Sequence, residues 1–283
     1  MELCHYTSLG GLQGIISSKS IWATNYSFLN DSTEFTYGLE CFEKFLTKAN
    51  DLEDSSTWVD HLRKVHKYIS EVETPEIYTT SFCSNKDLLS QWRGYAQQGV
   101  CIVFDQGFIN KIGWWCHNPY ESWSEAPENL LIPKFDIYHN DVTYIENGAE
   151  HTTIDEKLRK IKDAYKNFFT PDISDEIFDE SVCPKLFGLT IPFIKHSSFR
   201  EEAEHRLMVL RVNNPSDLRF RCSGDAIIPY IELSVKEEIL PITEVVIGPG
   251  GNGSLLEKGL RMMLDHHGYT DVKITHSNIP YRS

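Results

Sequence analysis

The chain has 283 residues, 41% of them hydrophobic and 12% aromatic, and a formal net charge of −14. This composition supports a substantial buried core, whereas the acidic balance argues against a broad nucleic-acid-binding surface, which needs clustered Lys and Arg. The chain has no apolar run of membrane-spanning length, and its start, MELCHYTS, lacks a basic stretch followed by an apolar one, so neither a membrane nor a secreted protein is expected.

Up to about residue 105, short strands alternate with helices. The pattern of apolar residues predicts strands at residues 2–6, 20–24, 77–83 and 100–104. It predicts helices at residues 8–17, from the Asn30-Asp31-Ser32 turn through Leu46, and at about 55–72, with a short helix or turn at 88–92.

The region from about 106 to 190 is less regular. It contains a predicted strand at residues 142–145 and an acidic, amphipathic helical stretch that carries Ile161, Tyr165, Phe168 and Phe169. The last region predicts strands at about 204–212, 226–233 and 243–248, a Gly-rich turn, a helix at 254–267 and a strand at 271–276.

The seven cysteines are scattered and never form a Cys-x-x-Cys pair. A zinc site and a disulfide framework are therefore poorly supported, and a reducing, cytoplasmic location is expected. The chain also lacks the His-Glu-x-x-His, Gly-x-Ser-x-Gly and phosphate-loop motifs. No metal ligand is predicted.

Three short polar runs interrupt segments that otherwise resemble buried strands. They are His5-Tyr6-Thr7, Ser81-Phe82-Cys83-Ser84 and residues 199–206. A strand interior rejects such side chains unless hydrogen bonds satisfy them. The pattern therefore predicts strands that converge on a polar cleft, which favours an enzyme.

The first run leads through Gln13-Gly14-Ile15-Ile16 to Ile21-Trp22-Ala23-Thr24. This succession resembles the N-terminal NAD-binding element of ADP-ribosyltransferases, in particular of the toxin DarT and its relatives. The chain is also similar over nearly its whole length to a large bacterial family of unknown function. That family combines His-Tyr-Thr with Leu-Asn-Asp-x-x-Glu, Ser-Phe-Ser before Asp and Trp, Phe-x-x-Glu-x-Glu-Trp-Arg and Ile-Gly-Pro.

The corresponding stretches here are residues 5–7, 29–34, 81–92, 199–206 and 247–249. His205 stands where the family has Trp, which changes a packing position and leaves the Glu and Arg of the motif in place.

The resemblance implies an α+β protein of ADP-ribosyltransferase-like architecture, with split β-sheets flanked by helices. We expect a single domain over residues 1–283 with a partly helical insertion at about 106–190. The implied function is transfer of ADP-ribose from NAD to a macromolecular acceptor, in phage defence or a toxin system of the bacterial cytoplasm.

Cleavage of the nicotinamide–ribose bond passes through an oxocarbenium-like sugar that a carboxylate can stabilise. Glu204 is the candidate for this role. On a strand, Glu202, Glu204 and Arg206 lie on one face, so Arg206 would orient Glu204 or hold a pyrophosphate, and Glu202 is the alternative acid. An exposed edge strand with solvated charges is the competing interpretation.

Several further residues are candidates for binding NAD. His5 and Thr7 face one side of the first strand and Tyr6 the other, and His5 would donate to a ribose hydroxyl or to backbone. An aromatic ring could stack on nicotinamide, and the same rings would equally suit a core. The aromatic candidates are Trp22, Trp92 and Tyr95, and the polar ones are Asn30, which also suits helix capping, and Ser81, which also suits a strand end.

Three alternative functions stay open on the sequence. The first is a NAD glycohydrolase. The second is an RNA phosphotransferase, which needs basic residues that this chain supplies sparingly. The third is a non-catalytic sensor or interaction protein that binds a nucleotide.

Overall fold

The computed structural model describes residues 2–29, 33–51, 57–71, 77–96, 98–112, 135–146, 148, 150–164, 183–212, 217–235, 239–250 and 253–280. The chain divides into two compact units. Unit 1 comprises Met1–Thr24, Tyr78–His139 and Glu201–Ser283, and unit 2 comprises Asn25–Ile77 and Asn140–Arg200. Whether the two behave as the single predicted domain stays a prediction.

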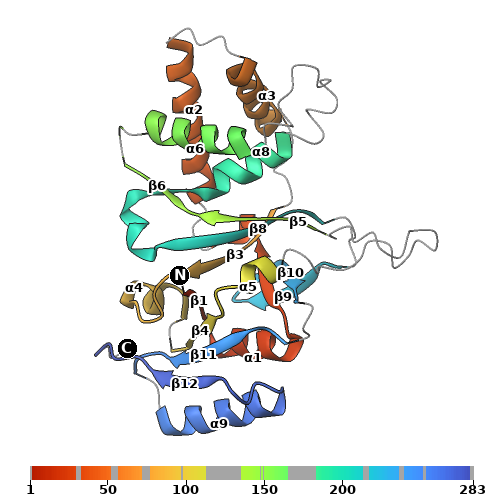
Figure 1. The fold of residues 1–283 in the computed structure, drawn as a ribbon, viewed down its shortest axis with the longest axis vertical. Helices are drawn as coiled ribbons and strands as arrows, with labels where there is room; N and C mark the ends of the chain where they lie inside the picture. Colours follow the sequence, from red (N-terminus) through yellow and green to blue (C-terminus); the bar gives the residue numbers. More distant parts are fainter. Residues whose placement is uncertain are drawn as a thin grey trace, which may run out of the picture. The chain divides into compact units, whose positions relative to one another are not determined.

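Unit 1 is built on a ten-stranded sheet (Figure 1). Its strands are β1 (Leu3–Thr7), β2 (Ile21–Asn25), β3 (Ile77–Cys83), β4 (Val100–Phe104), β5 (Phe135–Asp141), β8 (Glu204–Val212), β9 (Arg219–Ser223), β10 (Ala226–Leu233), β11 (Ile242–Ile247) and β12 (Lys273–His276). Its helical segments are α1 (Leu9–Ser18), α4 (Leu89–Gln91), the π-helical turn η2 (Trp92–Ala96), α5 (Phe108–Ile112) and α9 (Gly253–His266).

The strand order is β12-β11-β4-β1-β3-β2-β10-β9, and β8 pairs with both β3 and β5. β11 and β12 are parallel, whereas β1 runs antiparallel to β4 and to β3. β1 and β4 share a continuous register along the whole of β1, but β1 and β3 share only the pair Cys4↔Cys83. The sheet is therefore mixed, and β1 and β3 meet at a single residue pair.

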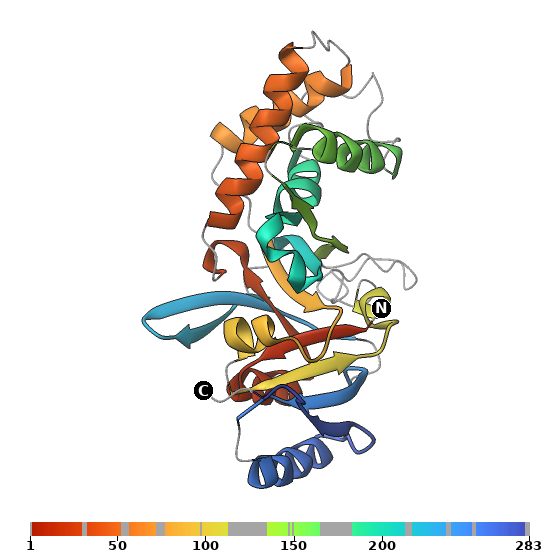
Figure 2. The same ribbon diagram turned by 90° about the vertical axis from the view of Figure 1, so that its left-hand side faces the viewer.

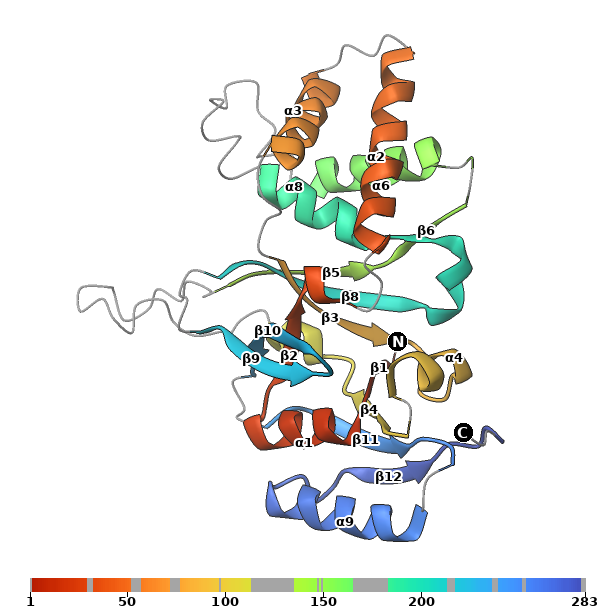
Figure 3. The ribbon, with the colours of Figure 1, turned by 180° about the vertical axis from the view of Figure 1, so that it is seen from behind.

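Two apolar cores cover opposite faces of this sheet, because side chains alternate along each strand. In the larger core, Val100, Ile102 and Phe104 of β4 pack together with the apolar faces of helices α1 and α9. α1 lies against β1 and β4, and α9 lies against β12 (Figure 3). Cys101 and Val103 of β4 point to the other face.

The smaller core is completed by the π-helical turn. Its buried members are Cys4, Tyr6, Cys83, Trp92, Ala96, Cys101, Val103 and Val246. The turn lies against β1 (Figure 2). The larger core thus stabilises the sheet on one face, and the smaller core fixes the π-helical turn on the other.

Unit 2 is mainly helical. Its elements are η1 (Tyr26–Phe28), α2 (Thr33–Asp51), α3 (Thr57–Glu71), β6 (Thr143–Ile145), α6 (Glu150–Ala164), α8 (Cys183–Thr190), η5 (Ile191–Phe193), β7 (Ile194–His196) and most of η6 (Ser197–Glu202). β6 and β7 form a short parallel pair. α2 buries Phe42 and Phe45, α3 buries Leu62, and α6 buries Leu158. In these helices the buried residues recur at the spacing of one helical face.

The predicted elements agree closely with the observed ones. β3, β4, β8 and β10 begin and end at the predicted residues, and β1, β2, β11, α1 and α9 are shifted by one residue. The fold is mixed α/β with one large mixed sheet. β5, β9, α5, α8 and β7 were not predicted. The insertion expected at about 106–190 falls partly on residues 113–134 and 165–182, outside the described residues.

No helix within the described ranges combines the length and the apolar character that crossing a bilayer requires.

Candidate functional site

A buried carboxylate and guanidinium open strand β8. Glu204 is its first residue, and Arg206 lies on the same face two residues later. Arg206 donates from Nε and Nη2 to Glu204 Oε1 at 2.8 and 2.7 Å. Glu204 is 6% exposed and Arg206 1%. The expected pairing is therefore present, and the competing interpretation of solvated charges on an exposed strand is wrong.

A third donor comes from the neighbouring strand. Ser81 of β3 donates from Oγ to Glu204 Oε1 at 2.5 Å. Thr79, on the same face of β3, donates to the Leu207 carbonyl at 3.0 Å and helps to hold β3 beside β8. Hydrogen bonds to an ionised group are short and strong, so the Glu204 carboxylate is held rigidly by two strands.

Glu202 does not lie on the strand, contrary to the prediction. It ends the 3₁₀ turn η6, and the next residue, Ala203, has a left-handed φ of 42°. That conformation is costly for a residue with a Cβ and recurs at functional sites. Glu202 is nevertheless buried, at 9% exposure, and its Oε1 accepts from the Tyr95 hydroxyl at 3.4 Å.

Tyr95 stands on the π-helical turn and is 43% exposed. Such turns are rare and often occur at functional sites. The turn is anchored by Trp92, which is 1% exposed and contacts the Tyr6 ring edge-on, with 4.8 Å between ring centroids. Of the two aromatic candidates here, Tyr95 is accessible to a ligand and Trp92 packs in the core.

Tyr6 is engaged in structure. Its hydroxyl donates to the Asn85 carbonyl at 2.8 Å and accepts from the Leu88 amide at 2.9 Å. Burial, reinforced by the nearby Cys101 thiol, raises the pKa of Tyr6 far above its usual value. The phenol therefore stays protonated and connects β1 to the segment before the π-helical turn.

His5 and Thr7 lie on the sheet face opposite to Ser81 and Glu204. Cys4 and Cys83 are paired across the two strands and lie on one face of the sheet. Because side chains alternate along a strand, Ser81 lies on that same face and His5 lies on the opposite one. His5 Nδ1 nonetheless donates to the Ser81 backbone carbonyl at 3.0 Å, and burial lowers the pKa of His5. Ser81 and Glu204 thus meet as expected, whereas His5 contacts this pair only through the Ser81 backbone, and the predicted cleft stays a prediction.

Trp22 contacts none of the site residues described above. Its indole stacks near Tyr230, with 4.6 Å between ring centroids, and donates to Ser18 Oγ at 3.3 Å. Its ring lies so close to Gly14 that a Cβ there would come within 2.2 Å of it. Asn30 lies outside the described residues.

Asp87 joins the π-helical turn to the C-terminal segment. The short helix α4 has no side-chain cap, and Asp87 instead accepts from Trp92 Nε1 at 2.8 Å. It also accepts from Ser277 Oγ at 2.5 Å and from the Asn278 amide at 2.9 Å. Sequence reasoning missed this role because local pattern carries no signal for partners so far along the chain.

The thiols beside the site are not nucleophiles. Burial raises the pKa of Cys83 to about 11, with smaller contributions from Glu202 and Glu204. A thiol with that pKa is protonated at neutral pH and reacts poorly. No cluster of three or more His, Cys, Asp or Glu suited to a metal ion occurs within the described ranges.

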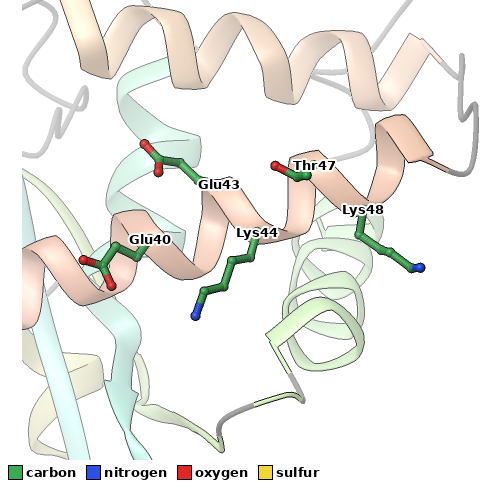
Figure 4. Close-up of a pocket in the computed structure, with 5 residues that line it drawn as sticks. All are labelled: Glu40, Glu43, Lys44, Thr47 and Lys48. Atoms are coloured by element: carbon green, nitrogen blue, oxygen red, sulfur yellow. The ribbon is translucent and has the colours of Figure 1, made fainter.

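A hollow of about 440 Å³ lies on unit 2, well apart in sequence from these residues. It is lined by Glu40, Glu43, Lys44, Thr47 and Lys48, which all project from α2 (Figure 4). All five side chains are exposed. Acidic and basic residues spaced four apart are typical of a solvated helix face, so we assign no site here.

Comparison with protein families gives one match. Residues 91–207 match a family described as protein of unknown function (DUF2971), in agreement with the expected likeness to an uncharacterised family. The matched range contains Trp92, Tyr95, Glu202, Glu204 and Arg206 and leaves out the N-terminal candidates. No curated protein and no solved structure matched the chain.

Proposed function

We propose that this protein transfers ADP-ribose from NAD to a macromolecular acceptor. The observation that carries the proposal is the carboxylate of Glu204, held by Arg206 and Ser81. A second buried carboxylate, that of Glu202, is two residues away and hydrogen-bonded to the accessible Tyr95. Two carboxylates in different surroundings suit the cleavage of a glycosidic bond.

The proposed reaction divides the work between these groups. The bond between ribose C1′ and the nicotinamide nitrogen breaks, and its electron pair leaves with neutral nicotinamide. Glu204 stabilises the positive charge that develops on the sugar, and Arg206 and Ser81 keep it in place. A nucleophile of the acceptor then bonds to C1′, and Glu202 takes the proton that this nucleophile loses.

The sheet provides further support. ADP-ribosyltransferase-like proteins, which the N-terminal sequence resembles, have split sheets. In unit 1, β1 and β3 are joined by the single pair Cys4↔Cys83. We propose that this joint corresponds to the split and that nicotinamide binds on the Ser81 and Tyr95 side of it.

A non-catalytic nucleotide sensor is the second candidate. The observation that favours it is the burial of Glu204 and Arg206, at 6% and 1% exposure, since an enclosed ion pair on β8 that also accepts from Ser81 of β3 can serve to hold these two strands together. A glycohydrolase, in which water replaces the acceptor, shares the same site.

The test uses NAD labelled in its adenosine half, incubated with the protein and total cell extract. Protein, DNA and RNA fractions are then counted, and nicotinamide release is measured in parallel. We expect label in one macromolecular fraction, and we expect Glu204→Gln to reduce the rate of labelling about 100-fold or more. Glu202→Gln should also lose transfer, and the exposed Glu201→Gln is the matched control that retains it.

Each outcome selects one function. Nicotinamide release without labelled macromolecule indicates a glycohydrolase, and NAD binding without turnover indicates the sensor. If folded Glu204→Gln consumes NAD as fast as wild type, the catalytic assignment is wrong. Thermal melting of each variant checks the fold, because removing one partner of a buried ion pair is costly.

A further inference from the structure

Arg221 is a half-buried arginine whose guanidinium is only partly hydrogen-bonded within the described residues. It stands on β9, and its one hydrogen bond runs from Nη2 to Thr24 Oγ1 of β2 at 3.3 Å. Its Nε is buried and has no hydrogen-bond partner in the part of the chain that the structure describes. No described acidic side chain forms an ion pair with it.

Three strands contribute to the surroundings of Arg221. Thr24 and Trp22 come from β2, and Tyr230 comes from β10, directly opposite Thr24. The rings of Trp22 and Tyr230 lie 4.6 Å apart with 34° between their planes. Arg221 lies near the Tyr230 hydroxyl. The charges of Arg219 and Glu232 also influence the pKa of Tyr230.

Glu232 does not neutralise Arg221. It is the cross-strand partner of Trp22, and it raises the pKa of Tyr230, whereas burial and Tyr230 account for the shift in the pKa of Arg221. Arg219, two residues before Arg221 on the same face, is opposite Tyr230 and donates to the Leu218 carbonyl at 3.3 Å.

An unsatisfied, partly buried guanidinium is unfavourable. Burial lowers the pKa of Arg221, yet arginine stays protonated in proteins, so the charge persists. The chain carries 41 Asp and Glu residues against 27 Lys and Arg, and a carboxylate beside Arg221 would be easy to supply. Its absence among the described residues points to an anion that comes from outside the chain.

We infer that Arg221 and Thr24 form a binding site for the phosphate of a nucleotide. The guanidinium fork matches phosphate oxygens, and an oxygen could accept from Nη1 while the Thr24 hydroxyl donates to another. Trp22 is half-buried, and the exposed part of its ring offers an aromatic surface to a base beside the phosphate. The site is separate from Glu204 and does not rest on ADP-ribosyl transfer.

The test measures the binding of inorganic pyrophosphate, NAD and a single-stranded oligonucleotide to the full chain by calorimetry at low salt. We expect pyrophosphate and NAD to bind, and Arg221→Gln to weaken both at least tenfold. Arg221→Lys keeps the charge without the fork and should give an intermediate loss. Arg219→Gln, on the same strand and face, is the matched control and should change affinity less than twofold.

The outcomes separate this site from the proposed reaction. Failure of wild type to bind any of the three probes overturns the site, as does an equal loss in Arg221→Gln and Arg219→Gln. Binding of the oligonucleotide but not of NAD keeps the site and identifies its phosphate as that of a nucleic acid. Nicotinamide release by wild type and by Glu204→Gln is scored separately, so the transferase proposal can fail while this site stands.

Discussion

Single side chains of β3 differ sharply in their surroundings. Thr79 and Ser81 lie on one face and donate to Leu207 O and Glu204 Oε1. Thr80 lies between them on the other face, is 3% exposed, and its Oγ1 has no hydrogen-bond partner within the described ranges. A buried hydroxyl without a partner destabilises the folded state.

This contrast gives a stability prediction. Thr80→Val keeps the side-chain volume and removes the unsatisfied hydroxyl, so we expect unchanged or increased stability, by up to about 1 kcal/mol. Thr79→Val is the matched control, and its free energy of unfolding should fall by roughly 1–2 kcal/mol because the hydrogen bond to β8 disappears. Urea unfolding of both variants measures the difference. A larger loss of stability in Thr80→Val than in Thr79→Val would contradict this prediction.

His5 gives a pH prediction. Burial lowers the pKa of His5 below its usual 6.5, so the unfolded chain binds the proton more readily than the folded one. The stability that neutral His5 contributes is therefore present above pH 6.5, and it is lost as the pH falls towards the pKa of His5 in the folded state. We expect His5→Gln to lose less stability than wild type between pH 7.5 and 5.5, measured by urea unfolding.

His66→Gln, a substitution in α3 at a histidine that contacts Glu43, is the control for that experiment. An equal pH dependence in His5→Gln and wild type would show that His5 does not contribute.

At the scale of elements, the π-helical turn is held from two sides. Trp92 packs on Tyr6 of β1, and Asp87 joins Trp92 to the segment after β12 through Ser277 and Asn278. Ser277 also donates its amide to the Ile247 carbonyl at the end of β11. The C-terminal segment thus helps to position the turn that carries Tyr95.

Asp87→Asn tests this connection. Asn replaces one acceptor oxygen by an amide donor, which then faces other donors. We therefore expect the free energy of unfolding to fall by about 1–3 kcal/mol. Faster hydrogen exchange at the Asn278 amide and a shift in Trp92 fluorescence should accompany it. Asp105→Asn, at an exposed residue that accepts from the Gly107 amide, is the control, and unchanged exchange in Asp87→Asn would disprove the connection.

At the scale of the molecule, the chain passes between the two units several times. The boundaries fall at residues 24/25, 77/78, 139/140 and 200/201. Strands β2, β3 and β5 each contain such a boundary. Neither unit is a continuous segment, so each is made of chain pieces that are connected through the other.

We therefore expect one cooperative unfolding transition. Far-ultraviolet circular dichroism, which is dominated by helices, and tryptophan fluorescence should give the same urea midpoint. Two separate midpoints would show that the units unfold independently and would contradict the single-domain prediction.

The limits of sequence-based prediction follow from the range of the forces involved. β3, β4, β8 and β10 were predicted to the residue because each has a compact apolar run. β9 (Arg219–Ser223) was not, because it is largely exposed and polar and is a strand only through pairing with β10. Glu202 was misplaced on a strand because the left-handed Ala203 has no sequence signal.

By itself the sequence determined the elements, the face shared by Glu204 and Arg206, and the likeness to an uncharacterised family, because alternation and motifs act over a few residues. Only the tertiary structure decided that Ser81 joins Glu204, that His5 lies across the sheet from both, and that Arg221 Nε is buried without a hydrogen-bond partner in the described part of the chain. Those facts depend on strand register and burial, which are set by packing between segments far apart in the chain.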